Sequence, residues 1–375
     1  MTGAVTPSPQ AKKPTTALRS KVAVVFTRPE TVLEDIARAM HLADYQAALP
    51  REHPTLLKIN ISWQHWYPAC STSPWQLDGV IKTLRDDGYR DLIPAQNGTV
   101  VVDSYEGERN NKHKAALDKV GLQSVHLDVP PTRWVRYEPK GELLVLDRIF
   151  PEAITIPETF LGKNIIHLPT MKTHVFTTMT GAMKNAFGGL LNRKRHWTHA
   201  AIHETLVDLL TIQKEIHPGI FAVTDGTFAG DGPGPRAMRW HVKNVFLASA
   251  DQVAIDAVAA KMMGFDPLSI PFIRLAHERG LGCGDVREIE VVGEEISQVN
   301  WGFRSAENTI ASRGQKLIYW GPLKPLEHLL LRSPLVGLAY LGSNLYHNGY
   351  WLNLVGRGRI REALKTGWGR LFQQY

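Results

Sequence analysis

Short apolar runs and amphipathic segments alternate along most of this chain. The runs Lys21–Phe26 and Thr55–Ile61 are largely apolar, which is typical of buried strands. Residues 31–49 read as a helix with acidic side chains early, and Pro74 starts a second helical segment. This alternation predicts an α/β protein with a mainly parallel sheet and helices on both faces. The predicted strands cover residues 21–26, 55–61, 89–94, 99–103, 124–128, 164–168, 220–224, 244–248 and 288–292, and the predicted helices cover residues 31–49, 74–88, 109–120, 199–216, 252–263 and 271–279.

The alternation stops in residues 129–162, where prolines and glycines separate strand-like pieces at 134–137, 143–146 and 154–156. This pattern predicts a small antiparallel excursion. We therefore divide the chain into five parts. They are a leader (1–20), a first α/β part (21–128), the excursion (129–162), a second α/β part (163–300) and a helical, basic and aromatic C-terminal extension (301–375).

The leader is rich in Pro, Thr and Lys and lacks an apolar core segment, so we expect a disordered leader and not a signal peptide. No window of eighteen apolar residues occurs, and we expect no membrane-spanning helix.

Polar, chemically active side chains follow the predicted strand that ends at Leu168. Ligands of open α/β sheets bind just beyond the carboxyl ends of the strands, so a site is expected here. The composition suits the binding of an anion or a metal. The side chains concerned are Lys172, His174, Thr180, Lys184, Asn185, His196, His199 and His203, with glycines at 181, 188 and 189.

Four ordered motifs resemble those of the domain of unknown function 362 family. They are Lys58–Asn60 with Ser73-Pro74, Leu168–His174 with Thr180–Gly188, Val223–Gly226 with Gly230–Gly234, and Ala248–Gly264. The resemblance covers roughly residues 55–293. It implies that Thr180, Gly181, Lys184 and Asn185 belong to a functional site.

Many members of that family carry an appended ferredoxin-like module, and this chain departs from that pattern. Its two cysteines, Cys70 and Cys283, cannot provide four thiolates, so we expect no iron–sulfur cluster. Two reduced, buried thiols are the expectation for a cytosolic protein.

An anionic ligand is the first expectation for the site. A helix start at Gly181 would offer free N–H groups to a carboxylate or phosphate, while the segment does not match a Walker A loop. Imidazole titrates near neutral pH, which makes His174 and His199 candidate acid–base groups beside Lys184. The candidate ligand-binding residues are Lys58, Asn60, Lys172, Thr180, Gly181, Asn185 and Asp231.

His199 and His203 are four residues apart on a predicted helix, a spacing at which two imidazoles can bind one metal ion. A divalent metal is therefore a candidate cofactor. The alternatives are a histidine bonded to the backbone at a helix start and anion binding by imidazolium. No His-Glu-x-x-His occurs, which excludes a zincin-type protease.

Three aspartates have different expected roles. Asp225 ends an apolar strand and is a candidate general base, metal ligand or orienting group, with an Asx-turn as the alternative. Asp251 is expected to cap the helix that starts at Gln252. Asp256 lies among apolar residues of that helix and needs a partner, for which we expect a lysine or histidine of the central motif.

Gly181, Lys184 and His199 are also remotely similar to positions in the nickel-pincer lactate racemases. This similarity implies proton or hydride transfer next to a substrate carboxylate. The racemases' other histidine-bearing motifs do not occur here.

The net charge of +7 is concentrated in the C-terminal extension. From Lys316 to Tyr375 there are eight Lys or Arg against Glu327 and Glu362, which leaves the body near neutrality and argues against nucleic-acid binding. Basic residues with Trp and Tyr among apolar segments suit docking on an anionic membrane surface or a protein partner. The alternative is a helical wrap that buries the aromatic side chains against the body.

Three functions remain open at this point. The first is a cytoplasmic enzyme that acts on a small anionic substrate by His/Lys acid–base chemistry, with or without a metal. The second is a non-catalytic protein that presents a metal or metabolite to a partner. The third is an accessory factor at a membrane surface.

Overall fold

The computed structural model describes residues 20–99, 101–305, 307–327, 329 and 336–375. The leader, apart from Ser20, lies outside the described residues. Strands of the central sheet follow the order β13–β1–β12–β10–β7–β2–β3–β4, in which β12 is antiparallel to both neighbours and every other pair is parallel. The predicted α/β class with a mainly parallel sheet is confirmed. The strands on this path are β1 (Lys21–Phe26), β2 (Thr55–Ile59), β3 (Leu92–Gln96), β4 (Val125–His126), β7 (Asn164–Leu168), β10 (Ile220–Asp231), β12 (Val245–Ser249) and β13 (Glu290–Gly293).

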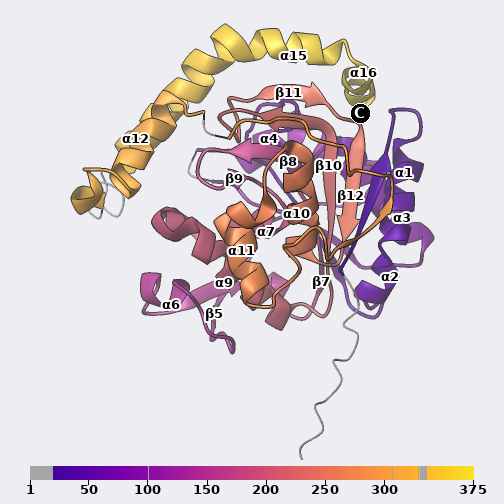
Figure 1. Ribbon diagram of the computed structural model, residues 1–375, viewed down its shortest axis with the longest axis horizontal. Helices are drawn as coiled ribbons and strands as arrows, with labels where there is room; N and C mark the ends of the chain where they lie inside the picture. The colour runs from indigo at the N-terminus through magenta and orange to yellow at the C-terminus, as the bar shows by residue number, and fades with distance from the viewer. Residues whose placement is uncertain (1–19, 100, 306, 328, 330–335) are drawn as a thin grey trace, which may run out of the picture.

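Helices cover both faces of the sheet (Figure 1). One face carries α1 (Val32–Leu42), α2 (Tyr45–Ala48), α3 (Pro74–Asp86), α4 (Ser104–Asn110) and α5 (His113–Asp118). The other face carries α7 (Ala182–Asn185), α8 (Phe187–Leu190), α9 (Ile202–Ile216), α10 (Gln252–Met263) and α11 (Pro271–Glu278).

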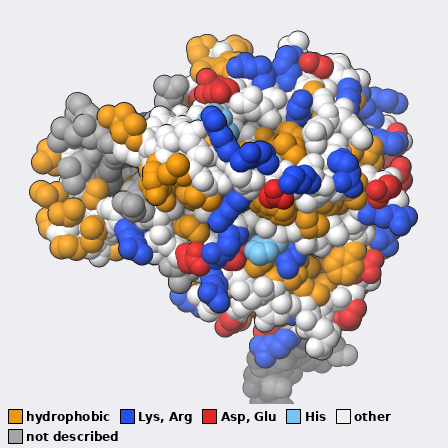
Figure 2. Space-filling view, turned by 90° about the horizontal axis from the view of Figure 1, so that it is seen from above, with side chains coloured by type: hydrophobic (Ala, Val, Ile, Leu, Met, Phe, Trp, Pro, Cys, Tyr) orange, Lys and Arg blue, Asp and Glu red, His pale blue; other side chains and the backbone are white. Residues whose placement is uncertain are grey.

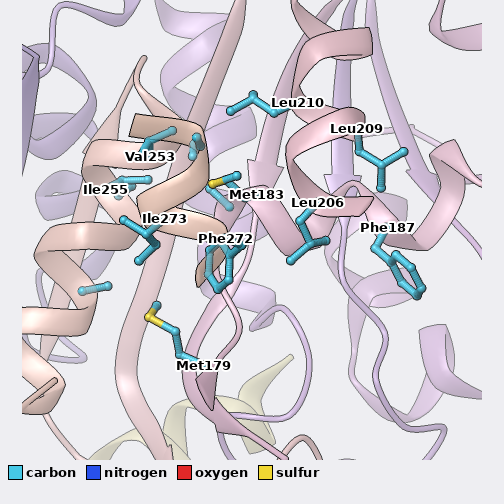
Figure 3. Packing of buried hydrophobic residues seen from close by; sticks show 14 of the residues in the cluster. Met179, Met183, Phe187, Leu206, Leu209, Leu210, Val253, Ile255, Phe272 and Ile273 are labelled. Carbon is cyan, nitrogen blue, oxygen red and sulfur yellow. The ribbon is translucent and has the colours of Figure 1, made fainter. Parts of the chain in front are cut away.

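Alternate side chains of the strands pack into two separate hydrophobic cores. In β1, Val22 and Val24 join one core while Ala23 and Val25 join the other, as the two-residue period of a strand requires. Figure 3 shows part of the first core, where side chains of α7, α9, α10 and α11 interdigitate. This core fixes α7 against the sheet, and α7 carries Lys184 into the site described below.

The excursion is antiparallel as predicted, with β5 (Trp134–Tyr137) paired to β6 (Ile154–Pro157). Its middle piece differs from the prediction, because α6 (Leu146–Ile149) is a helix. The carboxylate of Asp208 accepts the main-chain N–H groups of residues 144–146 and bends the chain there.

Other departures from the predicted elements have local causes. The predicted strand at 99–103 is wrong: Thr99 and Val102 form an isolated bridge, and Asp103 caps α4. The predicted helix 31–49 is divided at Asp44, which has a left-handed backbone. A short hairpin of β8 (Thr170–His174) and β9 (Thr178–Met179) was not predicted, and β10 extends to Asp231 and pairs with β11 (Arg239–Val242).

The C-terminal extension leaves the body, arches over it and returns at its end (Figure 1). Trp351, Trp368 and Phe372 are buried in the second core, so this half of the extension wraps the body. No helix within the described ranges is long and apolar enough to cross a membrane. The elements are α12 (Ile310–Tyr319), η4 (Lys324–Leu326), α14 (Val336–Asn344), the π-helix η5 (Leu345–Gly356), α15 (Arg357–Leu364) and α16 (Gly367–Gln374), and Arg332 lies outside the described residues.

Candidate functional site

Two adjoining cavities open at the carboxyl ends of the sheet strands. The larger, of about 390 Å³, lies beyond the ends of β2 and β3 and reaches the C-terminal extension. The smaller, of about 70 Å³, lies beside β8 and α7. Both are lined by Asn60, Ser62, Lys184, Asn185 and Pro235, so they form one continuous site. The edge of the sheet is the one expected from the placement of ligands in open α/β folds.

The structure brings the three central predicted residues together. Lys184 lines both cavities, His199 lines the larger and His174 the smaller. Charge on Lys184 lowers the pKa of both imidazoles, which places the three groups within electrostatic reach of one another. The strand that ends at Leu168 predicts that the three side chains meet at one sheet edge; the structure places His174 and His199 in adjoining cavities that share Lys184.

The helix start at Gly181 is already occupied by a side chain of the protein. Asp256 accepts hydrogen bonds from the N–H groups of Ala182 (2.7 Å) and Met183 (3.1 Å). A Cβ at position 181 would lie 2.2 Å from Oδ1 of Asp256, which explains the glycine. The prediction of free N–H groups for a ligand is therefore wrong, and so is the expected pairing of Asp256 with a lysine or histidine. Asp251 caps α10 as predicted, through the N–H groups of Val253 and Ala254.

Lys58 and Lys172 are almost completely buried at this site. The ammonium of Lys58 donates to the carbonyl of Ile59 (2.6 Å), and that of Lys172 donates to the carbonyl of Cys70 (2.9 Å) and the hydroxyl of Thr170 (2.6 Å). Burial lowers the pKa of Lys58 to about 7 and that of Lys172 to about 8, because a charged ammonium is poorly solvated there.

Lys184 is similar in its electrostatics. Burial, with added repulsion from Lys172 and Arg195, lowers its pKa to about 7. Its ammonium lies 5.1 Å from the centre of the Phe187 ring, a cation–π contact.

The imidazoles titrate at lower pH than the sequence predicts. Burial, followed by the charge on Lys184, lowers the pKa of His199 to about 3 and that of His174 well below its ordinary value. Both rings are therefore neutral at pH 7 in this structure, and the lysines are the groups that titrate near neutrality.

Three polar residues that were predicted to bind a ligand line the site, but each side chain already donates a hydrogen bond to a main-chain carbonyl of the protein. Asn185 donates to the carbonyl of Lys58 (2.8 Å), and Asn60 donates to the carbonyl of Cys70 (3.2 Å). Thr180 donates to the carbonyl of Thr170 (3.1 Å). These residues tie α7, β2 and β8 together and thereby position the lysines.

Among the residues of the larger cavity that sequence reasoning missed are Arg195, Arg236 and Tyr319. Arg195 donates to the carbonyl of Gly98 (3.1 Å) and Arg236 to that of Ser62 (2.9 Å). Tyr319 of α12 stacks on His199 with ring centres 5.6 Å apart. Arg195 lies in the histidine-rich segment and could have been included, whereas nothing in the local sequence connects Tyr319 with the site.

Asp225 and Asp231 lie outside the two cavities. Asp225 is buried beside a separate space of about 20 Å³, where it accepts from the Ser73 hydroxyl and from the N–H of Thr227 (2.6 Å). Burial raises its pKa to about 6. Asp231 accepts from the N–H of Arg304 (2.7 Å) at the end of β10.

The proposed metal pair has a different geometry from the predicted one. A 3₁₀ segment covers residues 193–201 and α9 starts at Ile202, so His199 and His203 do not share an α-helix. His203 stacks on Phe272, with ring centres 6.0 Å apart. Within the described residues, no three His, Cys, Asp or Glu side chains are grouped so as to hold one metal ion. Cys70 and Cys283 are free, with Cys70 buried and Cys283 half-buried.

The chain is similar in sequence to known proteins. A family model described as "Domain of unknown function (DUF362)" matches residues 55–261, more than half of the chain. The chain is also 26% identical over 219 residues to a thylakoid-associated protein of Synechocystis sp., covering 56% of this chain and 63% of that relative. This chain thus matches less than two thirds of the relative's length. No solved structure matches it.

Proposed function

This chain belongs to the domain of unknown function 362 family, and from its site we propose that it binds a small anionic substrate and moves a proton to or from it. One observation carries the proposal: five cationic side chains line the two adjoining cavities, and no Asp or Glu is among the described residues that line them. The five are Lys58, Lys172, Lys184, Arg195 and Arg236.

Buried ammonium groups at a site favour an anionic ligand. Removal of an ammonium from water costs free energy, and the lowered pKa values of Lys58 and Lys184 express that cost. A carboxylate or phosphate between them would offset it by direct attraction. Arg195 lowers the pKa of both lysines, which makes the space among these three side chains the expected anion position.

Lys184 is the favoured acid–base group. A general acid or base works best with a pKa near the operating pH, and Lys184 has a pKa of about 7. His174 and His199 would act as neutral hydrogen-bonding partners, since burial and Lys184 hold their pKa values low. Asp225 would act at a distance, because its carboxylate raises the pKa of Lys172 from outside the cavities. Proton transfer next to a carboxylate is also the chemistry implied by the remote similarity to the racemases.

We place this activity in the cytoplasm, at a membrane surface. The apolar exposed surface of the C-terminal extension supports this placement. The relative's name, thylakoid-associated protein, agrees with it.

Titration calorimetry of the full chain with inorganic phosphate, pyrophosphate and succinate tests binding. We expect at least one of these anions to bind, with affinity that falls as the pH rises above about 7 and the lysines lose charge. Lys184→Met should weaken that binding at least about tenfold. Lys214→Met, on the exposed side of α9, is the matched control and should bind as the wild type does. Equal affinity in Lys184→Met and the wild type would contradict the proposal.

Proton exchange separates an enzyme from a carrier. In D₂O, the wild type should catalyse exchange of the α-protons of a carboxylate that it binds, as followed by proton NMR. Lys184→Met should fold normally and exchange none. Tight binding by the wild type with no exchange of any bound carboxylate would instead support the non-catalytic binding protein.

A further inference from the structure

The first half of the C-terminal extension presents an apolar outer surface. We call α12, η4, α14 and η5 up to Val355 the apolar lobe (the described residues of 310–355), of which Trp351 and Leu352 are buried in the second core. Figure 2 shows hydrophobic side chains gathered on the projecting part at the left of the view. Leu341 is 56% exposed and Leu354 is 69% exposed. Contiguous exposed apolar surface of this kind marks an interaction site. Its exposed large side chains are Leu317, Trp320, Leu323, Leu326, Leu329, Leu341, Leu345, Tyr350 and Leu354.

The same lobe forms a wall of the larger cavity. Gln315 and Tyr319 of α12 and Val336 and Ser343 of α14 line it. The indole of Trp320 donates to the carbonyl of Ala200 (3.0 Å), which anchors α12 to the segment that carries His199. The lobe therefore has one side against the cationic cavity and another side exposed.

The cavity itself is amphipathic. Of the described residues, four cationic side chains line it, and so do apolar groups, among them Ile61, Val101, Phe187 and Val336. A small inorganic anion would leave this apolar wall uncovered. An anion that carries a hydrocarbon chain would cover it.

The charge of the lobe suits an anionic bilayer. Residues 309–355 contain Glu327 as their single acid, and the described bases are Arg313, Lys316 and Lys324. Arg313 and Lys324 are exposed. Leucines with Trp and Tyr beside Lys and Arg are typical of surfaces that lie in the membrane interface without crossing it.

We propose that the apolar lobe inserts into the interface of an anionic bilayer and that the substrate is an amphiphilic anion taken from it. The phosphate or carboxylate head occupies the space among Lys58, Lys184 and Arg195. Its hydrocarbon chain lies along the apolar wall formed by Ile61, Val101, Phe187 and Val336. This inference rests on the proposed anion binding and names the substrate class.

Two measurements on the full chain test the inference. In the first, calorimetry compares decyl phosphate, below its micellar concentration, with inorganic phosphate. Wild type should bind decyl phosphate at least about tenfold more tightly, the effect of burying roughly two methylene groups. Lys184→Met should lose both ligands.

In the second, flotation with vesicles of phosphatidylcholine plus phosphatidylglycerol should recover the wild type and Lys184→Met. The double variant Leu341→Ser/Leu345→Ser should stay unbound. Leu161→Ser, which alters an exposed leucine of the body, is the matched control and should float as the wild type does.

The outcomes separate the two proposals. If the wild type binds neither phosphate nor decyl phosphate, the proposed anion binding fails. If it binds phosphate as tightly as decyl phosphate, the amphiphile is wrong and anion binding stands. In a further outcome, the wild type fails to float with the vesicles and sediments as a dimer that Leu341→Ser/Leu345→Ser converts to a monomer. In that case a second copy of the chain covers the lobe, and the proposed membrane binding is wrong.

Discussion

Lys58 shows how a single side chain connects stability with ligand binding. It is 2% exposed, and its ammonium donates to a carbonyl and to no carboxylate in the described structure. Unfolded lysine keeps its proton up to about pH 10, whereas folded Lys58 releases it near pH 7. The unfolded state therefore binds more protons than the folded state between these pH values. Buried Lys58 lowers the free energy of unfolding most below about pH 7, and this destabilisation becomes smaller as the pH rises.

Lys58→Met should accordingly stabilise the ligand-free protein. We expect the free energy of unfolding to rise by about 1 kcal/mol at about pH 6, and by less at about pH 9. Urea unfolding at both pH values measures this, with Lys214→Met as a control that should change neither value. A variant less stable than the wild type at about pH 6 would contradict the account of Lys58.

Gly181 and Asp256 form a second coupled pair. Ala at position 181 would collide with the carboxylate of Asp256, and Asp256→Ala would leave two buried N–H groups without an acceptor. Each single change should cost about 3 kcal/mol. The double variant should cost at least about 1 kcal/mol less than the sum, because the collision disappears with the carboxylate.

The control for this pair is Gly314→Ala in α12, where an added Cβ meets open space. It should be neutral or stabilise the protein slightly. Strict additivity of Gly181→Ala and Asp256→Ala in chemical unfolding would show that the two residues do not act on one another.

At the level of single residues, the sequence predicted which groups gather but not which are already bonded. A helix start at Gly181 was predictable from the residue types. Its occupant was not, because Asp256 lies on another helix, 74 positions from Ala182. The same holds for the imidazoles, since only the folded environment reveals that Lys184 and burial suppress their pKa values.

Among the elements, those with strong periodicity and clear caps were predicted well. Helix α10 begins at Gln252 and ends at Met263 as predicted, between the Asp251 cap and Gly264 in a left-handed conformation. Elements shaped by distant contacts were predicted poorly. The carboxylate of Asp208 accepts hydrogen bonds from residues 144–146 and so fixes the chain where α6 begins. The β8–β9 hairpin depends on the pairing of β8 with β10.

The last element, α16, is predicted to be part of the folded core. Trp368 packs 5.2 Å from Trp75 between ring centres, and its indole donates to Asn244 (2.7 Å). Trp368→Ala should lower the free energy of unfolding by about 4 kcal/mol, through the lost packing and the cavity left behind.

Trp320→Ala is the matched comparison, because Trp320 is 45% exposed on the apolar lobe. Its cost should stay below about 1 kcal/mol in the same urea titration. If both variants lose stability equally, the division between a wrapped end and an exposed lobe is wrong.

At the scale of the whole molecule, residues from distant parts of the chain complete one site. Strands of both α/β parts pair in the same sheet, β2 with β7, and the extension adds Tyr319 to the cavity. The sequence predicted the three lysines and the sheet edge, but not Arg195 and Arg236. The sequence did not predict that half of the basic extension wraps the body. Its Trp and Arg residues are compatible with an exposed or a buried face, and only the packing in the folded structure distinguishes the two.

The central claim is that an anion occupies the space among Lys58, Lys184 and Arg195. Crystals of the full chain soaked in selenate, measured at the selenium edge, test it most directly. We predict an anomalous peak within hydrogen-bonding distance of the Lys184 ammonium and the Arg195 guanidinium, absent from Lys184→Met crystals. Peaks confined to exposed basic side chains, with none in the cavity of the wild type, would contradict the account.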